Sequence, residues 1–216
     1  MELERAVVVS FDAATYTATV RLERSLSGVQ SGVAVARHLA AWQLKPGDEV
    51  VVGVWDALVA SERCVIASLA ARRRPMCRVR RTTSQPIPSG TQTALAFDVA
   101  RYDTDGMWSA EAPTRLTIQT AGRYHVGFAA SFDEPTGAGS VRGASLWVNG
   151  ALVIATVVVA PRPGGTQTQI PVVSGDYLFS AGEYLEGRVV QDSGGSVPVF
   201  SFSAWSPELW AHWIEA

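Results

Sequence analysis

The chain has 216 residues, of which 47% are hydrophobic, and a formal net charge of −2. This length allows one domain or two with cores of ordinary size. No apolar run approaches the roughly 20 residues of a membrane-spanning helix, which excludes that class of protein. The amino terminus, Met-Glu-Leu-Glu-Arg, lacks the basic and apolar regions of a signal peptide. We therefore expect synthesis in a cytoplasm and no secretion by the general route.

The first 70 residues predict short strands joined by turns. Thr15–Leu22 alternates polar and apolar side chains, which is typical of a half-buried strand. Leu44–Asp48 contains Pro-Gly, which favours a tight turn. The other predicted strands are 6–10, one beginning at 33–35, 49–55 and 63–69. Five short strands in so few residues favour a small closed barrel.

Three segments of this half resemble a known module. Thr17–Leu22, Leu44–Val52 and Val65–Ala67 follow the order of an oligonucleotide/oligosaccharide-binding (OB) type barrel found at the start of many phage tail-spike and baseplate proteins. The resemblance covers about 60 residues. It implies that residues 1–71 form an OB-like barrel that docks on a virus particle.

Charge is unevenly placed along the chain. Residues 1–84 carry a net +4 and residues 85–216 a net −6, and six Arg fall within residues 72–81. This cluster is either a nucleic-acid patch or a solvated joint between domains that contacts an acidic partner. No aromatic residue lies between Ala70 and Pro86 to stack on bases, so we expect the joint and no nucleic acid.

From residue 91 onward, strand signals recur every 8–12 residues. The predicted strands are 93–99, 115–119, 122–131, 142–149, 151–159, 168–173, 176–180, 184–190, 196–204 and 208–214. No segment shows a helical period over ten or more residues. We therefore predict an all-β protein: a five-stranded OB-like barrel, a basic, Pro-containing linker at residues 72–90, and a ten-stranded jelly-roll sandwich at 91–216.

The order of motifs in the second half resembles the jelly roll of the complement and tumour-necrosis-factor (TNF) type. It comprises Phe97 before Tyr102-Asp103, Gly122–Phe128, Asn149-Gly150 and Gly182–Leu185. Domains of this family usually work as trimers, so the resemblance implies a homotrimer. Glu183 stands where the family has Asp, which weakens transfer of a calcium site.

The carboxyl-terminal segment is rich in Trp. Trp205, Trp210 and Trp213 fall within nine residues. In a strand, Trp210, His212 and Ile214 would share one face and Leu209, Ala211 and Trp213 the other. A strand that is apolar on both faces needs cover on both, which a trimer could supply. A short helix with Ser206 as N-cap and Pro207 at its first position is the alternative.

These patterns give candidate binding residues. The candidates for the trimer interface are Tyr124, Phe128, Phe200, Phe202, Trp205, Trp210, His212, Trp213 and Ile214. The candidates for particle docking are Arg72, Arg73, Arg74 and Arg78.

Residues that could carry catalysis are sparse. His38, His125 and His212 are far apart in sequence, and Gly-x-Ser-x-Gly is absent. Cys64 and Cys77 do not make a disulfide framework. We expect no catalytic residues, no cofactor and no metal site, although calcium binding by Asp103, Asp105 or Asp133 remains an open alternative.

The sequence therefore favours a structural protein of a bacteriophage particle, namely a trimeric spike, a fibre tip or a head or tail decoration protein, and not an enzyme. The barrel would dock on other virion proteins, and the jelly roll would trimerise and bind a host-surface glycan or protein. Localisation would be the virion, after assembly in the host cytoplasm. A bacterial carbohydrate-binding or adhesin module on the same scaffold is the alternative. The sequence does not distinguish head from tail.

Overall fold

The computed structural model describes residues 1–23, 28–55, 62–70, 74–133, 139–162, 167–202 and 205–215. Within these ranges the chain is all-β apart from short 3₁₀ turns such as Ala41–Gln43. It divides into two compact units, Met1–Arg73 and Arg74–Glu215. In the part of the chain described, no helix has the length and apolarity to span a bilayer.

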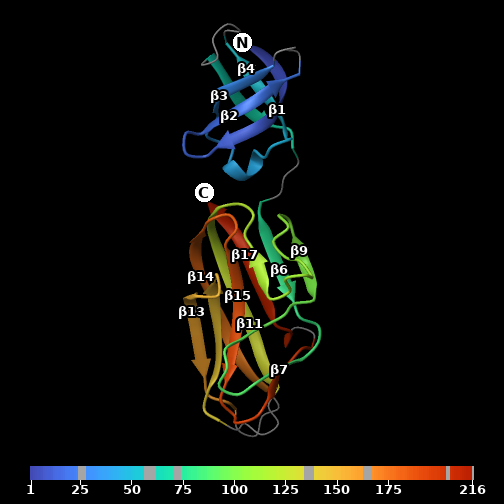
Figure 1. Cartoon of the computed structure of the whole chain (residues 1–216), viewed down its shortest axis with the longest axis vertical. Coiled ribbons are helices and arrows are strands. Elements are labelled where there is room, and N and C mark those ends of the chain that lie inside the picture. Colours follow the sequence, from blue (N-terminus) through green and yellow to red (C-terminus); the bar gives the residue numbers. More distant parts are fainter. Residues whose placement is uncertain are drawn as a thin grey trace. The chain divides into compact units, whose positions relative to one another are not determined.

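The first unit is a closed five-stranded barrel, which confirms the prediction (Figure 1). Its strands are β1 (Glu2–Asp12), β2 (Thr17–Leu22), β3 (Val29–Val35), β4 (Glu49–Val54) and β5 (Arg63–Ser68). They pair in the order β1-β2-β3-β5-β4, and β4 closes onto β1. β3 and β5 pair in parallel, and the other pairs are antiparallel.

Alternation of side chains builds the barrel core. Val20, Val33 and Val50 point inward and are fully buried, while their sequence neighbours face outward. The first hairpin is held by Asp12, whose carboxylate accepts hydrogen bonds from the backbone N–H of Ala14 at 2.9 Å and from the Thr15 hydroxyl at 2.9 Å. These bonds hold the pKa of Asp12 below its usual value, with the Thr15 hydroxyl as the largest cause.

The second unit is a jelly-roll sandwich of two sheets. The five-stranded sheet contains β10 (Arg115–Thr117), β15 (Tyr184–Gln191), β12 (Arg142–Val148) and β13 (Leu152–Val159) in that order, with β8 (Thr93–Ala94) beside β15. The seven-stranded sheet has the order β7 (Gln85–Ile87), β16 (Val197–Val199), β11 (Gly122–Asp133), β17 (Glu208–Glu215), β6 (Met76–Arg80) and β9 (Val99–Asp103), with β14 (Gln167–Phe179) beside β11.

Aromatic side chains of β11 fill the space between the two sheets. Tyr124, Phe128 and Phe132 alternate along the strand and are fully buried. The sheets approach closely at Gly187 of β15, where a Cβ atom would lie 2.6 Å from the Phe128 ring. Only glycine fits at this position, because the two sheets approach too closely there to leave room for a side chain.

The Asn-Gly hairpin predicted from sequence is confirmed. Asn149 and Gly150 have φ angles of 52° and 67° and connect β12 to β13. Two successive positive φ values are what a tight hairpin turn requires, because they match the right-handed twist of the strands. The Asn149 amide also donates a hydrogen bond to Glu183 at 3.0 Å, which ties the hairpin to the turn before β15.

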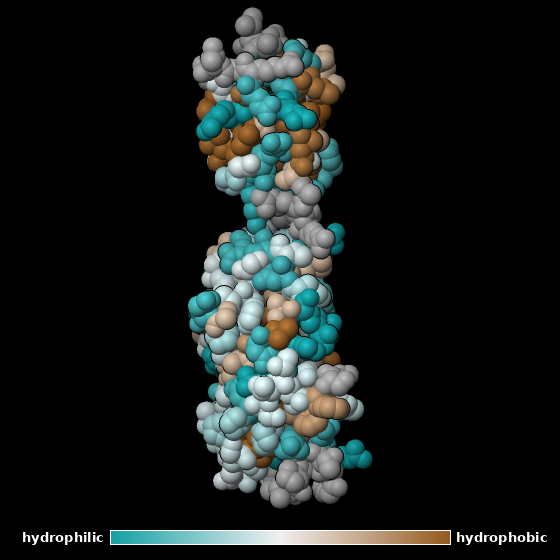
Figure 2. Space-filling view, turned by 90° about the vertical axis from the view of Figure 1, so that its right-hand side faces the viewer, coloured by the Kyte–Doolittle hydropathy of each residue, from teal (hydrophilic) through white to brown (hydrophobic). Residues whose placement is uncertain are grey.

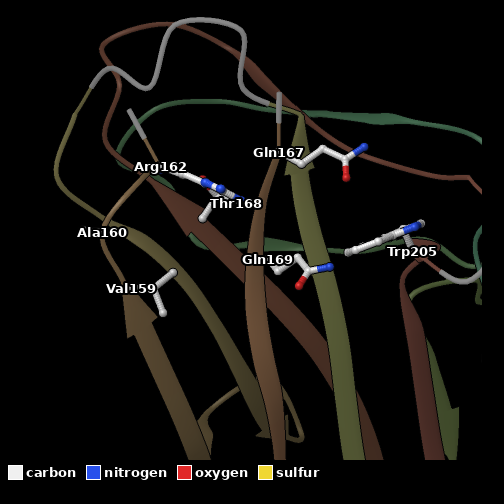
Figure 3. Close-up of a pocket in the computed structure, with 7 residues that line it drawn as sticks. All are labelled: Val159, Ala160, Arg162, Gln167, Thr168, Gln169 and Trp205. Carbon is white, nitrogen blue, oxygen red and sulfur yellow. The ribbon is translucent and has the colours of Figure 1, made fainter. Parts of the chain in front are cut away.

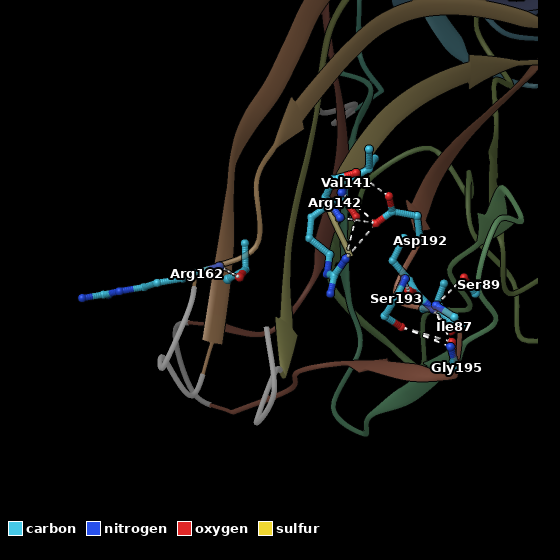
Figure 4. A network of polar contacts seen from close by, with 12 residues as sticks. Ile87, Ser89, Val141, Arg142, Arg162, Asp192, Ser193 and Gly195 are labelled. Atoms are coloured by element: carbon cyan, nitrogen blue, oxygen red, sulfur yellow. Dashed lines mark hydrogen bonds and ion pairs between the residues drawn. The ribbon is translucent and has the colours of Figure 1, made fainter. Parts of the chain in front are cut away.

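A polar network holds the opposite end of the five-stranded sheet (Figure 4). Asp192 accepts hydrogen bonds from the Ser140 hydroxyl at 2.7 Å and from the backbone N–H of Val141 at 2.7 Å. It also lies 3.5 Å from a guanidinium nitrogen of Arg142, a fully buried side chain that packs over the Phe132 ring. These contacts, with the Ser140 hydroxyl as the largest cause, hold the pKa of Asp192 below its usual value.

Three details of the predicted organisation differ from the structure. The range 72–90 is no linker from Arg74 onward, because β6 and β7 lie in it and pair with β17 and β16. The jelly roll has more than ten strands in its described residues, since β6, β7 and β9 were missed. The predicted strands 168–173 and 176–180 form the single long β14, which follows β11 across one irregularity.

The close approach at Gly187 predicts a measurable loss of stability. Gly187→Ala places a methyl group against the Phe128 ring, and we expect the free energy of unfolding of the jelly roll to fall by about 1–3 kcal/mol. Gly175→Ala is the matched control, because a Cβ there has no heavy atom within 4 Å. Chemical denaturation followed by Trp fluorescence measures both variants. Equal stability of the two would contradict the packing argument.

Candidate functional site

The side of the seven-stranded sheet that points away from the core carries an unusual set of side chains. We call it the outer face, and it comprises Arg78, Arg101, Tyr102, His125, Asp176, Glu208, Trp210 and His212. β17 forms as a strand and not as a helix, so this alternative is settled. Leu209 and Ala211 point into the core, and Trp210 and His212 lie half-buried on the outer face.

Trp210 lies flat on the backbone of the neighbouring strand. A Cβ atom at Gly127 would lie 2.1 Å from the indole, so only glycine leaves room for the ring. The guanidinium of Arg78 lies 5.5 Å from the centre of the Trp210 ring, in cation–π contact. The ring is therefore fixed in one orientation on the outer face.

Beside Trp210, one carboxylate joins two guanidinium groups. Glu208 accepts a hydrogen bond from Nε of Arg78 at 2.6 Å and another from Nε of Arg101 at 2.5 Å. The carboxylate is nearly buried, whereas both Arg side chains are about 40% exposed. The cluster has a net positive charge and presents it on the outer face. Charge-assisted bonds of this kind are stronger than neutral ones, so Arg78 is engaged inside the jelly roll.

Four strands of the same face, β14, β11, β17 and β9, contribute a row of polar side chains. Nδ1 of His125 lies 2.8 Å from Asp176, and Nε2 of His212 lies 2.7 Å from the Tyr102 hydroxyl. His125 and His212 are register partners on β11 and β17. Burial, followed by the charges of His125 and Arg78, lowers the pKa of His212 below its ordinary value of 6.5. His212 is thus neutral at pH 7.

One edge of the sandwich is apolar and exposed. β13 ends one sheet, β14 ends the other, and the two strands lie side by side (Figure 1). We call this the apolar edge, and it comprises Leu152, Val153, Val158, Val172 and Leu178. Exposed strand edges are sites of association unless they are covered or charged. These described strands offer no such protection at those five positions.

The predicted interface residues lie partly in the core and partly on the surface of the jelly roll. Tyr124 and Phe128 are fully buried core residues of one chain, so they have no surface left for a subunit contact and leave the candidate set. Trp213 is also buried, with its indole N–H donating to Ala121. Trp210 and His212 lie on the outer face, Ile214 is exposed near its end, and Phe200, Phe202 and Trp205 belong to the segment before β17.

The predicted docking residues do not form one surface. Arg72 and Arg73 lie outside the described residues. Arg74 packs over the Trp213 ring, 5.9 Å from its centre, and Arg78 is paired with Glu208. Residues 1–73 hold eight basic and eight acidic side chains, so the positive charge of the first 84 residues belongs to the jelly-roll unit. The barrel unit therefore has no net charge of its own for docking.

Sequence reasoning missed most of the outer face. Tyr102, His125, Asp176 and Glu208 come together from four strands, although successive members of this set are 23 or more residues apart in sequence. The pairing of strands brings them together, and a single sequence does not state that pairing. Among the described residues, no group of three His, Cys, Asp or Glu could hold a metal ion. Asp103, an open candidate for calcium, instead accepts hydrogen bonds from the backbone N–H groups of Met107 and Trp108.

The lowered pKa of His212 makes stability depend on pH. As the pH falls through about 6.5, the unfolded chain takes up a proton at this position before the folded chain does, so the folded state loses stability. We expect His212→Gln to lose less stability between pH 7 and pH 5 than the wild type. Calorimetry of the jelly-roll transition measures the difference, with His38→Gln in the barrel as the control. Parallel pH profiles for wild type and His212→Gln would contradict the assignment.

Comparison with known proteins identifies the fold of the second unit but assigns the chain to no sequence family. No protein-family model matches the chain, and no curated protein sequence matches it. The crystal structure of murine APRIL at pH 5.0 superposes with a TM-score of 0.51 at 9% identity, covering 66% of this chain and 100% of that chain. The globular domain of zebrafish complement 1qA gives a TM-score of 0.47 at 11% identity, covering 65% of this chain and 98% of that chain. The second unit thus has the jelly-roll fold of the complement/TNF type.

Proposed function

We propose that the chain is a structural protein of a bacteriophage particle. In this proposal it forms a homotrimer through its jelly roll, docks on other virion proteins through its barrel, and presents the jelly roll for host attachment or particle stabilisation. It assembles in the host cytoplasm. The role requires binding and assembly and no turnover of a substrate. The tandem of an OB-like barrel and a complement/TNF-type jelly roll supports it.

The proposed homotrimer is supported by two different exposed surfaces on one jelly roll. The outer face offers Trp210 and a positively charged cluster, and the apolar edge offers five aliphatic side chains. Aromatic residues and Arg are enriched in protein interfaces. When the edge of one subunit packs on the face of the next, the contact is heterologous, and a rotation of one third of a turn closes it into a ring. Closure leaves no exposed edge.

The barrel offers an apolar surface for docking. Leu3 and Trp55 are both exposed, and Leu3 is the register partner of Gly53, against which the Trp55 ring packs. Figure 2 shows brown, apolar residues reaching the barrel surface beside teal, polar ones. An exposed Trp next to an exposed Leu is typical of an interface core. Docking in this proposal rests on these side chains and not on charge.

A bacterial carbohydrate-binding or adhesin module is the second candidate. A hollow beside Trp205, lined by amide side chains, favours it. The two candidates share the trimer and differ in location, so imaging of purified particles with a specific antibody separates them. Label on particles supports the virion protein, and label confined to bacterial cells supports the adhesin.

A charge on the apolar edge should dissociate the trimer. We expect the wild-type chain of 23.1 kDa to elute from size exclusion with light scattering at three times that mass, and Val172→Glu to weaken association by roughly 100-fold. The physical reason is that a carboxylate would be buried without a partner. Val29→Glu is the matched control, since Val29 of the barrel is 52% exposed and Val172 is 56% exposed. A stable wild-type monomer would refute the trimer.

Removal of the barrel should abolish docking and leave the trimer intact. A chain that begins at Arg74 keeps every strand of the jelly roll. We expect it to trimerise in light scattering and to be absent from particles assembled in infected cells. Trp55→Ala in the full chain should lower incorporation without changing the trimer. Normal incorporation of the shortened chain would show that the barrel is not the docking module.

A further inference from the structure

A hollow of about 380 Å³ opens at one end of the jelly roll (Figure 3). It lies where β13 ends at Val159 and β14 begins at Gln167, the end opposite to Met76, where β6 begins. Gln167 and Gln169 line one side, and Trp205 stands across from them. A second hollow of about 290 Å³ shares Gln169 and Trp205 and continues over β14. We call the first hollow the Trp205 trough, because the second also includes Val172 of the apolar edge.

The side chains of the trough point outward in a repeating pattern. Gln167 and Gln169 are two positions apart on β14, so both face the hollow, about 7 Å from each other along the strand. Thr168 between them points inward and accepts a hydrogen bond from the backbone N–H of Arg162 at 3.0 Å. That bond fixes the backbone of Arg162 beside β14. The two amides thus line the hollow together with Arg162.

The polar groups of the trough differ from those of the outer face. On the outer face, His125, His212 and Glu208 all have side-chain partners. In the described part of the chain, no hydrogen bond engages the side-chain amides of Gln167 and Gln169 or the Arg162 guanidinium. Donors and acceptors that face a concave surface are available to a ligand.

The Trp205 ring provides the apolar part of the site. The side chain is 43% exposed, although it contacts both hollows. A flat indole can stack on the C–H face of a sugar ring, which excludes water from both surfaces. An amide offers two donors and an acceptor, which suits neighbouring hydroxyl groups. Together these groups match the alternating polar and apolar surfaces of a saccharide.

The positive charge of Arg162 in the trough favours acidic saccharides over neutral ones. Among the described residues that line the first hollow, Arg162 is charged and none is acidic. A guanidinium binds a carboxylate through two parallel hydrogen bonds. We propose that the Trp205 trough binds an oligosaccharide that carries a carboxylate, with Trp205 stacking on a sugar ring and Arg162 pairing with the acid. The inference rests on the proposed role in host attachment and names its ligand class.

Three copies would make a weak site effective. A shallow site of this volume contacts one or two sugar units, and we expect each copy alone to bind weakly. A trimer that reaches several sugars on one surface gains avidity without new contacts. The attachment role therefore suits a repetitive surface glycan better than a free sugar.

Binding to immobilised oligosaccharides tests the inference. The full-length chain is applied to uronic-acid-containing and sialic-acid-containing oligosaccharides and to neutral oligosaccharides of the same length. We expect preference for the acidic set and at least tenfold weaker binding for Trp205→Ala. Arg162→Gln should remove the preference while keeping weak binding to neutral sugars. Trp55→Ala, which removes an exposed Trp from the barrel, is the matched control and should bind like the wild type.

The outcomes separate this inference from the proposed function. No binding by the wild type, or unchanged binding by Trp205→Ala, overturns the saccharide site. A Trp205→Ala chain that loses the trimer in light scattering also overturns it, because the trough would then be a contact between subunits. Circular dichroism confirms that each variant is folded. A chain that trimerises and enters particles but binds no acidic oligosaccharide refutes the site and leaves the virion role standing.

Discussion

The pairing of β17 with β11 on one side and β6 on the other is the contact on which the jelly roll depends. β17 joins β6, the first strand of the unit, to β11 in the middle of the chain, and so completes the seven-stranded sheet. One face of β17 supplies Leu209 and Ala211 to the core, and the other sets Trp210 on Gly127. The same strand therefore builds the interior and displays the outer face, because side chains alternate along a strand.

Much of the fold could be predicted from local signals. Alternation in Thr17–Leu22, the Asn149-Gly150 turn and the alternation of Leu209–Ile214 all describe the structure well, because each depends on neighbours in sequence. β6 was missed although its signal was present. Cys77 and Val79 point inward and Arg78 and Arg80 outward, a strand pattern hidden by the number of Arg residues around it.

The candidate site was far less predictable. Of the predicted interface residues, Trp210 lies on the outer face, whereas Tyr124 and Phe128 belong to the core. Their role depends on which face of β11 meets the second sheet, and that is decided by the packing of distant strands. The row from Asp176 to Tyr102 likewise exists only through pairing across β14, β11, β17, β6 and β9. Charge shows the same limit, because the unit boundary falls within the basic cluster and assigns four of its six Arg to the jelly-roll unit.

The position of β17 also governs the order in which the protein can fold. Residues 1–73 form a closed barrel from neighbouring segments, so this unit can complete itself early during synthesis. β6 is made at the start of the second unit but waits for β17, 128 or more residues later, to gain its central partner. Contacts at such separation are slow to form and leave strand edges open meanwhile. The seven-stranded sheet of the jelly roll therefore stays incomplete until residues 208–215 have been synthesised. Truncation of this short segment should consequently impair folding of the whole unit.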